Sequence, residues 1–296
     1  MTIDLQAERA RLFALAYRML GSAADAEDVV QEALTRLQEE RAPPAAPGAW
    51  LTTVATRLCL DRARSAAAQR TRYVGPWLPE PVATPEMEAA PDPGERLSAA
   101  ESVSIAFLLV LERLSPLERA VFLLREIFDL DFPAIAASIG RSEAACRQLL
   151  RRAREHVAAA RPRFTPAREA HRNLVIAFLQ ACRAGDVEGL QRLLAEEVQL
   201  VADGGGKASA ALNVITGADR VTRFVVGVAR KLEEMPLGLG WVNGELAFIL
   251  WNGDGTADSV TVLSLAPDGE RIARIQTIRN PDKLRGFHRA AARARA

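Results

Sequence analysis

The side chains best suited to chemistry lie on one face of a helix that the sequence predicts after Ser142. Apolar residues at helical spacing, including Cys146 and Leu150, form the inner face of this helix. The opposite face carries Ala144, Arg147, Gln148, Arg151 and Glu155. Arginine and glutamine side chains hydrogen-bond to base edges, and arginine also binds phosphates. This face favours contact with DNA, although a solvated charged face on an ordinary amphipathic helix has the same pattern.

A helix-turn-helix would position this face. Ser115 and Glu118 form a capping box, with Pro116 at the first helical position. Asp131 can cap a short helix, Gly140 can turn the chain, and a new helix follows at once. Two helices, a tight glycine turn and a basic outer face are what a helix-turn-helix needs to enter a major groove. From spacing alone, a plain helical hairpin stays open as the alternative.

Two further polar surfaces lie nearer to the N-terminus. A helix that begins after Ser22 has an apolar inner stripe and an acidic outer side. Taken alone, such an acidic side is usually just solvated. A third helix, over residues 48–67, carries threonines and arginines, and Trp50 and Tyr73 bracket it. Aromatic rings beside arginines can hold unstacked bases, but packing at a helix end is the favoured role without further context.

Catalytic chemistry has few candidates in this chain. The three histidines, His156, His171 and His288, lie outside the strands that we predict. Asp203 could act as a base, but it opens a triple-glycine loop, where turn formation is the commoner role. This loop is not a P-loop, because Lys207 is followed by alanine and valine occupies the position of the first glycine. We therefore expect no catalytic residue, no cofactor and no metal site.

The composition indicates a soluble protein of two or three domains, with 296 residues, 49% hydrophobic content, 25% charged content and a net charge of +1. The net value conceals an acidic stretch over 80–101 and a basic stretch over 141–163, which suits contact with both a basic surface and an acidic polymer. The isolated cysteines are typical of a reducing compartment. No apolar stretch could span a bilayer and no signal peptide is present, so we expect a cytoplasmic protein without membrane contact.

Breaks in the pattern divide the chain into segments. Prolines between residues 76 and 93 predict a semi-rigid acidic linker. After residue 166 come helices and then hairpins with Asn-Gly and Asp-Gly turns. We predict domains at 1–72, 98–163 and 167–284, a linker at 73–97 and a basic tail at 285–296. The first two domains are predicted to be all-α, and the third to be α+β with a curved antiparallel sheet wrapped on helices.

Read together, these blocks resemble the bacterial extracytoplasmic-function (ECF) sigma factors, the RNA polymerase subunits that recognise promoters. The resemblance rests on four blocks in the right order, at residues 21–32 (GSAADAEDVVQE), 50–55 (WLTTVA), 58–62 (LCLDR) and 114–154. Three further motifs are similar to the subgroup with a fused C-terminal SnoaL-like (NTF2-like) domain, at residues 73–81 (YVGPWLPEP), 203–207 (DGGGK) and 280–284 (NPDKL). The resemblance covers almost the whole chain.

The resemblance implies that the first two domains bind core RNA polymerase and promoter DNA. The residues implied to bind the polymerase β′ clamp helices form the acidic face: Asp25, Glu27, Asp28, Gln31 and Glu32. The second helical domain would meet the β flap. The residues implied to bind the −10 element, where a flipped base is captured, are Trp50, Thr53, Thr56, Arg57, Arg62 and Arg64. Many ECF sigma factors carry Ala-Arg-Asn where this chain has Ala55-Thr56-Arg57, which leaves the identity of the base readers open.

The resemblance also implies a −35 reader. Arg147, Gln148 and Arg151 would face the bases or the adjacent backbone, and Arg141, Arg152 and Arg154 are better placed for phosphates. The complete implied −35 set is Arg141, Ser142, Ala144, Arg147, Gln148, Arg151, Arg152 and Arg154.

The C-terminal domain would regulate the sigma factor in cis by docking on sigma domain 2 and on the linker. The residues implied in this contact are Trp77, Leu78, Pro79, Glu80, Pro81, Asp203, Gly204, Gly205, Gly206, Lys207, Asn280, Pro281, Asp282, Lys283 and Leu284. A simple strand-ending turn is the alternative for the last motif. Two rival functions stay open. One is a duplex DNA-binding regulator that acts without polymerase, and the other is a SnoaL-like enzyme fused to a DNA-binding module.

Overall fold

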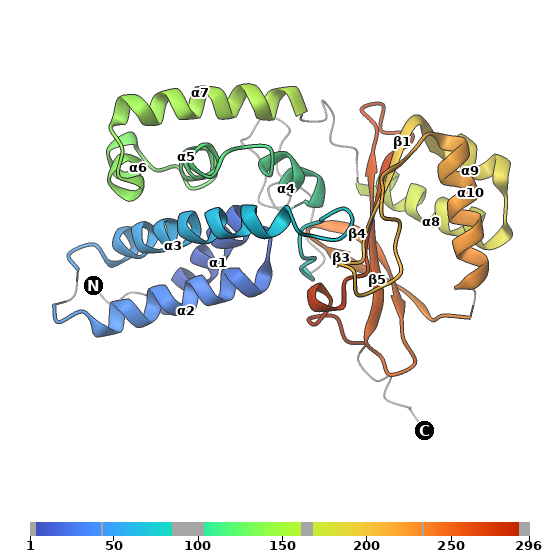
Figure 1. Ribbon diagram of the computed structural model, residues 1–296, viewed down its shortest axis with the longest axis horizontal. Helices are drawn as coiled ribbons and strands as arrows, with labels where there is room; N and C mark the ends of the chain where they lie inside the picture. The colour runs from blue at the N-terminus through green and yellow to red at the C-terminus, as the bar shows by residue number, and fades with distance from the viewer. Residues whose placement is uncertain (1–3, 43, 85–103, 161–167, 233, 290–296) are drawn as a thin grey trace. The chain divides into compact units, whose positions relative to one another are not determined.

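The computed structural model describes residues 4–42, 44–84, 104–160, 168–232 and 234–289. These residues belong to two compact units (Figure 1). The first unit contains helices α1 to α7. The second contains the segment that begins at Tyr73, helices α8 to α10 and the sheet. Residues 85–97 of the predicted linker and 290–296 of the predicted tail lie outside the described residues.

Three helices form the N-terminal half of the first unit: α1 (Leu5–Leu20), α2 (Ala23–Glu39) and α3 (Pro47–Arg70). Gly21 ends α1 with a φ of 68°, a conformation that glycine adopts without strain. Ser22 then caps α2 by accepting a hydrogen bond from the Asp25 N–H. The apolar stripe of α2 is fully buried at Val29 and Val30, so the acidic side of this helix faces outward as predicted.

The described residues of the other half of the first unit form α4 (Ile105–Leu111), α5 (Pro116–Glu126), α6 (Phe132–Ile139) and α7 (Glu143–Ala160). Both hydrogen bonds of the predicted capping box between Ser115 and Glu118 are present. Gly140 adopts a φ of 66° and ends α6. The buried Cys146 and Leu150 fix α7 with its basic side outward. The predicted helix-turn-helix is confirmed.

In the described residues, the second unit has three helices and six strands. The helices are α8 (Arg168–Ala184), α9 (Val187–Leu193) and α10 (Ala218–Lys231). The strands are β1 (Leu194–Asp203), β2 (Ile215–Thr216), β3 (Leu237–Val242), β4 (Glu245–Trp251), β5 (Ala257–Leu265) and β6 (Ile272–Ile278), followed by a 3₁₀ turn, η2 (Pro281–Lys283). Figure 1 shows the helices on one side of the sheet, where Phe178, Val221 and Leu263 help to form the core.

The strand order is β2-β1-β6-β5-β4-β3. The hairpins are antiparallel as expected, but β1 and β6 are parallel, so the sheet is mixed. A long connection through β2, α10 and the strands β3 to β5 separates β1 from β6 in the sequence, and hairpin signals carry no information about such a pairing. This pairing places Asp203, at the end of β1, opposite Ile278 and next to η2. Among the described helices, none combines the length and apolar character needed to cross a bilayer.

Candidate functional site

The acidic face of α2 surrounds one arginine of α3. The Arg62 guanidinium lies 3.3 Å from the Asp28 carboxylate and 3.4 Å from that of Glu32, and the Asp25 carboxylate is 4.0 Å away. Gln31 is exposed beside a surface hollow of about 470 Å³ that Asp28, Glu32 and Arg62 help to line. The structure therefore holds Arg62, a residue predicted to bind the −10 element, against the face predicted to bind polymerase.

Two other residues predicted to bind the −10 element contact the helix-turn-helix. The Arg57 guanidinium donates to the carbonyl oxygens of Ala137 and Ser138 at 2.9 and 3.1 Å. The Thr53 hydroxyl lies 3.1 Å from that of Ser138. These carbonyls are in the last turn of α6, where the helix dipole favours a positive charge. We call this set of interactions the α3–α6 contact.

The remaining residues predicted to bind the −10 element differ in exposure. Trp50 is half-buried near the start of α3, and Arg64 is exposed and pairs with Asp61 at 3.2 Å. Thr56 differs from the expectation, because it is fully buried and its hydroxyl donates to the Thr52 carbonyl at 2.7 Å. Its place on the inner side of α3 keeps it from facing DNA in this conformation.

A partly buried ionic cluster that no sequence motif indicated also joins the two halves of the first unit. The Arg119 guanidinium in α5 donates to the Met19 carbonyl of α1 at 2.7 Å and contacts the Glu112 carboxylate at 2.8 Å. Arg70, at the end of α3, pairs with the same Glu112. Burial lowers the pKa of Arg119 and of Arg70 to about 10. Both remain charged at neutral pH, so Glu112 holds two cations.

The basic side of α7 is exposed as predicted. Arg141, Ser142, Ala144, Gln148 and Arg152 are all exposed. The other three arginines are exposed and are also held by carboxylates, in the pairs Arg147–Glu143 (2.7 Å), Arg151–Glu155 (3.0 Å) and Arg154–Glu126 (2.7 Å). Exposed pairs of this kind are weak, so they orient the guanidinium groups without preventing contact with a phosphate.

One aromatic residue beside α7 was absent from the predicted site. Phe132 opens α6, and the guanidinium carbon of Arg147 lies over its ring at 4.8 Å from the centroid. The guanidinium carbon of Arg125 lies over the same ring at 5.6 Å. The sequence offered no signal for this role, because Phe132 falls within a stretch that is expected simply to pack.

In the second unit, two of the predicted motifs meet the described part of the linker at Asp203. Its carboxylate is fully buried and accepts hydrogen bonds from the Tyr73 hydroxyl at 2.6 Å and the Leu78 N–H at 2.8 Å. The Lys283 ammonium lies 2.7 Å from it and also donates to the Leu78 carbonyl at 2.5 Å. The Asn280 amide donates to the Tyr73 hydroxyl at 2.8 Å. We call these five residues the Asp203 cluster.

Aromatic rings complete the Asp203 cluster. The Lys283 ammonium lies over the Trp77 ring at 4.4 Å and over the Tyr73 ring at 5.0 Å from the centroids. Burial, and next the hydrogen bond to Asp203, raise the pKa of the Tyr73 hydroxyl above its ordinary value. Tyr73 therefore stays protonated and acts as a donor. Tyr73 opens the motif at residues 73–81, but the predicted contact set began only at Trp77.

The triple glycine allows the linker to approach closely. Gly205 and Gly206 have φ values of 58° and 71°, which disfavour other residues. A Cβ on Gly205 would overlap the Asn280 amide, and one on Gly206 would come within 3.1 Å of Val74. At the end of the same loop, Lys207 pairs with Asp282 on the surface. Asp203 is thus part of a binding loop for residues 73–78.

The linker then pairs with the edge of the sheet. Ala83 forms an antiparallel bridge with Val242 of β3, and the Thr84 N–H donates to the Trp241 carbonyl at 2.9 Å. Asn243 is fully buried, and its side chain accepts from the Val82 N–H at 2.9 Å. Four other residues of the predicted contact set are buried, namely Leu78, Pro79, Pro81 and Leu284, and Glu80 is half-buried. Two more members of the set, Gly204 and Pro281, belong to the two turns that flank the cluster. The Asn243-Gly244 turn, expected only to close a hairpin, also holds the linker.

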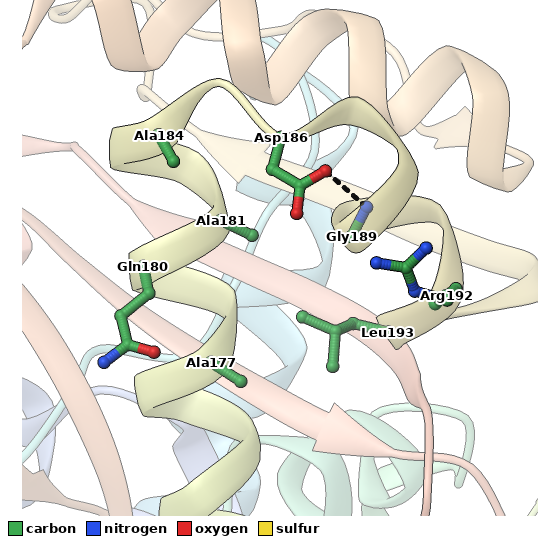
Figure 2. Close-up of a pocket in the computed structure, with 8 residues that line it drawn as sticks. All are labelled: Ala177, Gln180, Ala181, Ala184, Asp186, Gly189, Arg192 and Leu193. Atoms are coloured by element: carbon green, nitrogen blue, oxygen red, sulfur yellow. Dashed lines mark hydrogen bonds between the residues drawn. The ribbon is translucent and has the colours of Figure 1, made fainter.

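Two groups of the second unit that could serve catalysis, His171 and Asp186, hydrogen-bond to the backbone. His171 is half-buried with a ring nitrogen 2.7 Å from the Leu263 carbonyl, and burial lowers its pKa. A shallow hollow of about 340 Å³ lies between α8 and α9 (Figure 2). The carboxylate that lines it, Asp186, accepts the Gly189 N–H at 2.8 Å and so caps α9. Its other lining residues are Ala177, Gln180, Ala181, Ala184, Arg192 and Leu193, so carboxylates do not converge there.

Comparison with known proteins identifies the family. The family Sigma-70 region 2 matches residues 5–69, and Sigma-70, region 4 matches residues 104–157. The chain is 39% identical over 293 residues to the ECF RNA polymerase sigma factor SigJ of Mycobacterium tuberculosis, covering 96% of this chain and 93% of the relative. The chain belongs to the ECF RNA polymerase sigma factors. This sigma factor is also 34% identical over 294 residues to a probable ECF RNA polymerase sigma factor, SigI, of the same species, covering 94% and 93% of the two chains.

A solved structure agrees with this assignment. The crystal structure of the M. tuberculosis ECF sigma factor SigJ matches this sigma factor with a TM-score of 0.74 and 37% identity, over 95% of this chain and 97% of the other. Helices α1 to α3 therefore form region 2, and α4 to α7 form region 4. Among the described residues, a C-terminal α+β domain with a mixed sheet of six strands follows them.

Proposed function

We propose that this sigma factor binds core RNA polymerase through the acidic face of α2 and reads promoters with α3 and α7. The supporting observations are the exposed carboxylates Asp25 and Asp28 and the exposed arginines of α7. Complementary charge orients such a face on the basic clamp helices of the β′ subunit, and region 4 would meet the β flap. On α3 the proposed −10 residues are Trp50, Thr53, Arg57, Arg62 and Arg64. Thr56 is left out because it is buried.

The α3–α6 contact corresponds, in this proposal, to a closed form of the first unit. Arg57 and Thr53 cannot bind the −10 element while they contact the Ala137 and Ser138 carbonyls and the Ser138 hydroxyl. Region 4 must therefore move away from α3 before the −10 element is read. One of the hydrogen bonds that break is exposed and two are part-buried, and each contributes about 1 kcal/mol, so polymerase and promoter contacts can replace them.

Regulation in cis by the C-terminal domain is the second part of the proposal. The observation that carries it is the Asp203 cluster, in which a fully buried carboxylate binds the linker through Tyr73, Leu78 and Lys283. The linker joins the two promoter-reading regions, so a domain that holds residues 73–84 controls how much of the linker is free. In this proposal Asp203 has a structural role, because its carboxylate is occupied by the Tyr73 hydroxyl, the Leu78 N–H and the Lys283 ammonium.

Run-off transcription with core polymerase tests this regulation. Asp203→Asn keeps the shape of the side chain but removes the charge that binds Lys283, and we expect it to change the transcript yield at equal holoenzyme concentration. The matched control is Asp268→Asn, which removes an exposed carboxylate that pairs with Arg271 and lies outside the predicted contact set. Equal yields from the wild type and Asp203→Asn would refute regulation through the cluster. Tight promoter binding without polymerase, together with no transcripts in its presence, would refute the sigma mechanism itself.

A further inference from the structure

Phe132 lies where the helix-turn-helix brings two arginines together. Asp131 caps α6 by accepting the Ala134 N–H at 2.9 Å, which fixes the turn that carries the ring. Arg125, near the end of α5, lies over the ring and donates to the Leu130 carbonyl at 2.8 Å. Arg147, on the exposed side of α7, also lies over this ring. The ring thus connects the supporting helices to one side chain of the recognition helix.

We infer that Phe132 is a positioning residue that holds Arg147 ready to read a base of the −35 element. The inference rests on the proposed function, in which α7 reads that element. Glu143 holds the Nη2 atom of Arg147 at 2.7 Å, and the ring supports the guanidinium carbon at 4.8 Å. The side chain is still 55% exposed, so the remaining N–H groups are open to DNA.

Preorganisation gives this contact a functional consequence. A free arginine side chain loses rotamer freedom when it binds, and a ring that already restrains the guanidinium reduces that loss. A planar guanidinium reads guanine through two hydrogen bonds to O6 and N7, a geometry that depends on orientation. Arg147 lies in the N-terminal third of α7, the part of a recognition helix that contacts base edges. Phe132 therefore acts on base discrimination more than on overall DNA affinity.

Arg151 provides a comparison within the same helix. It lies one turn further along α7 and, within the part of the chain that the structure describes, pairs with Glu155 alone at 3.0 Å. Loss of the Phe132 ring does not change the contacts of Arg151. A base position that depends on Arg151 is therefore an internal control for one that depends on Arg147.

The test uses full-length sigma factor with core polymerase and a promoter library randomised in the −35 element. Transcribed sequences are counted for the wild type, Arg147→Ala, Arg151→Ala, Phe132→Leu and Phe132→Tyr. We expect Arg147→Ala to abolish a guanine preference at one position. Phe132→Leu, which keeps an apolar side chain, lowers the preference at that same position by about two- to five-fold, the effect of one exposed cation–π contact. Phe132→Tyr keeps the ring and retains the preference.

The outcomes separate this inference from the proposed function. If Arg147→Ala changes the preference at one position and Phe132→Leu does not, the role of Phe132 is refuted and the reading by α7 stands. If Phe132→Leu weakens the base preference equally at every −35 position, including the one that depends on Arg151, the ring has only a structural role. If neither Arg147→Ala nor Arg151→Ala alters any preference, −35 reading by this face of α7 fails, and the inference fails with it.

Discussion

Replacing Lys283 by methionine tests how firmly the C-terminal domain holds the linker. Methionine is also long and unbranched, so it fills a similar volume. It removes the ammonium that lies 2.7 Å from the Asp203 carboxylate and 2.5 Å from the Leu78 carbonyl. The Asp203 side chain is fully buried, and it would keep only the hydrogen bonds from Tyr73 and the Leu78 N–H. The docked linker would then cover a carboxylate that has lost its counter-ion.

The burial of this ion pair sets the free-energy cost of Lys283→Met. Removing one partner of a buried ion pair costs about 3–5 kcal/mol, because the remaining charge is left uncompensated. The Lys283 side chain is only 12% exposed, so solvent screens this pair little. The cost falls on the docked state, since water reaches Asp203 once the linker has left. At ~1.4 kcal/mol for each factor of ten, the docking equilibrium shifts by about 100-fold or more.

Amide hydrogen exchange measures this shift directly. The Leu78 N–H donates to Asp203, so its protection reports the docked state. We expect Lys283→Met to lower this protection by about 100-fold or more, while the amides of β5 keep theirs. The matched control is Lys207→Met. Its ammonium pairs with Asp282 on the surface with 56% of the side chain exposed, so less than about 1 kcal/mol is at stake.

Two results would refute this reasoning. Unchanged protection at Leu78 in Lys283→Met would show that the ion pair does not hold the linker. An equal loss of protection in β5 would show that the cluster maintains the fold of the whole domain, so that release of the linker could not be a separate event.

Three further predictions concern the Asp203 cluster and the α3–α6 contact. Gly205→Ala places a Cβ against the Asn280 amide, at a residue whose φ is 58°. We expect it to lower the free energy of unfolding by about 1–3 kcal/mol in denaturant titrations. An unchanged free energy of unfolding would contradict this expectation. The second variant combines Thr53→Cys with Ser138→Cys, at positions whose hydroxyls lie 3.1 Å apart. Oxidation to a disulfide should trap the α3–α6 contact and suppress run-off transcription, and a thiol reductant should restore transcription. Equal transcript yields in both redox states would show that this contact need not open. The pKa of Tyr73 is raised above the ordinary 10.0, so docking keeps its full stability below pH 10.0 and weakens as the pH rises through the folded-state pKa. The other tyrosine, Tyr17, is buried, so the measurement is the difference in tyrosinate absorbance between the wild type and Tyr73→Phe. This difference should titrate above pH 10.0, and a midpoint at or below pH 10.0 argues against the assignment.

Local features of this protein could be predicted because their causes are local. The capping box at Ser115 and Glu118 involves residues three positions apart, and both of its hydrogen bonds form as expected. The turn at Gly140 needs a positive φ, which one residue type supplies at little cost. The faces of α2 and α7 follow from helical periodicity, so their charged sides are outward as predicted.

Helical periodicity could not show which of the predicted DNA-binding residues are buried or contact another helix. Thr56 and the exposed Arg57 are neighbours in the sequence, yet Thr56 is buried and Arg57 reaches the carbonyls of α6. Which part of α3 faces another helix depends on the packing of regions 2 and 4, whose contacts span about 80 positions in the sequence. Periodicity describes one helix at a time and does not show its neighbour.

By itself, the sequence determined the two helical regions, the recognition helix and the motifs that mark the family. Resemblance, rather than spacing, linked the motifs of the linker and the C-terminal domain. Only the tertiary structure decided how they meet: the parallel pairing of β1 with β6 places Asp203 beside η2, and its carboxylate then binds the Leu78 N–H across 125 positions of sequence. A buried carboxylate must find its donors wherever the fold brings them, and no local pattern records where they are.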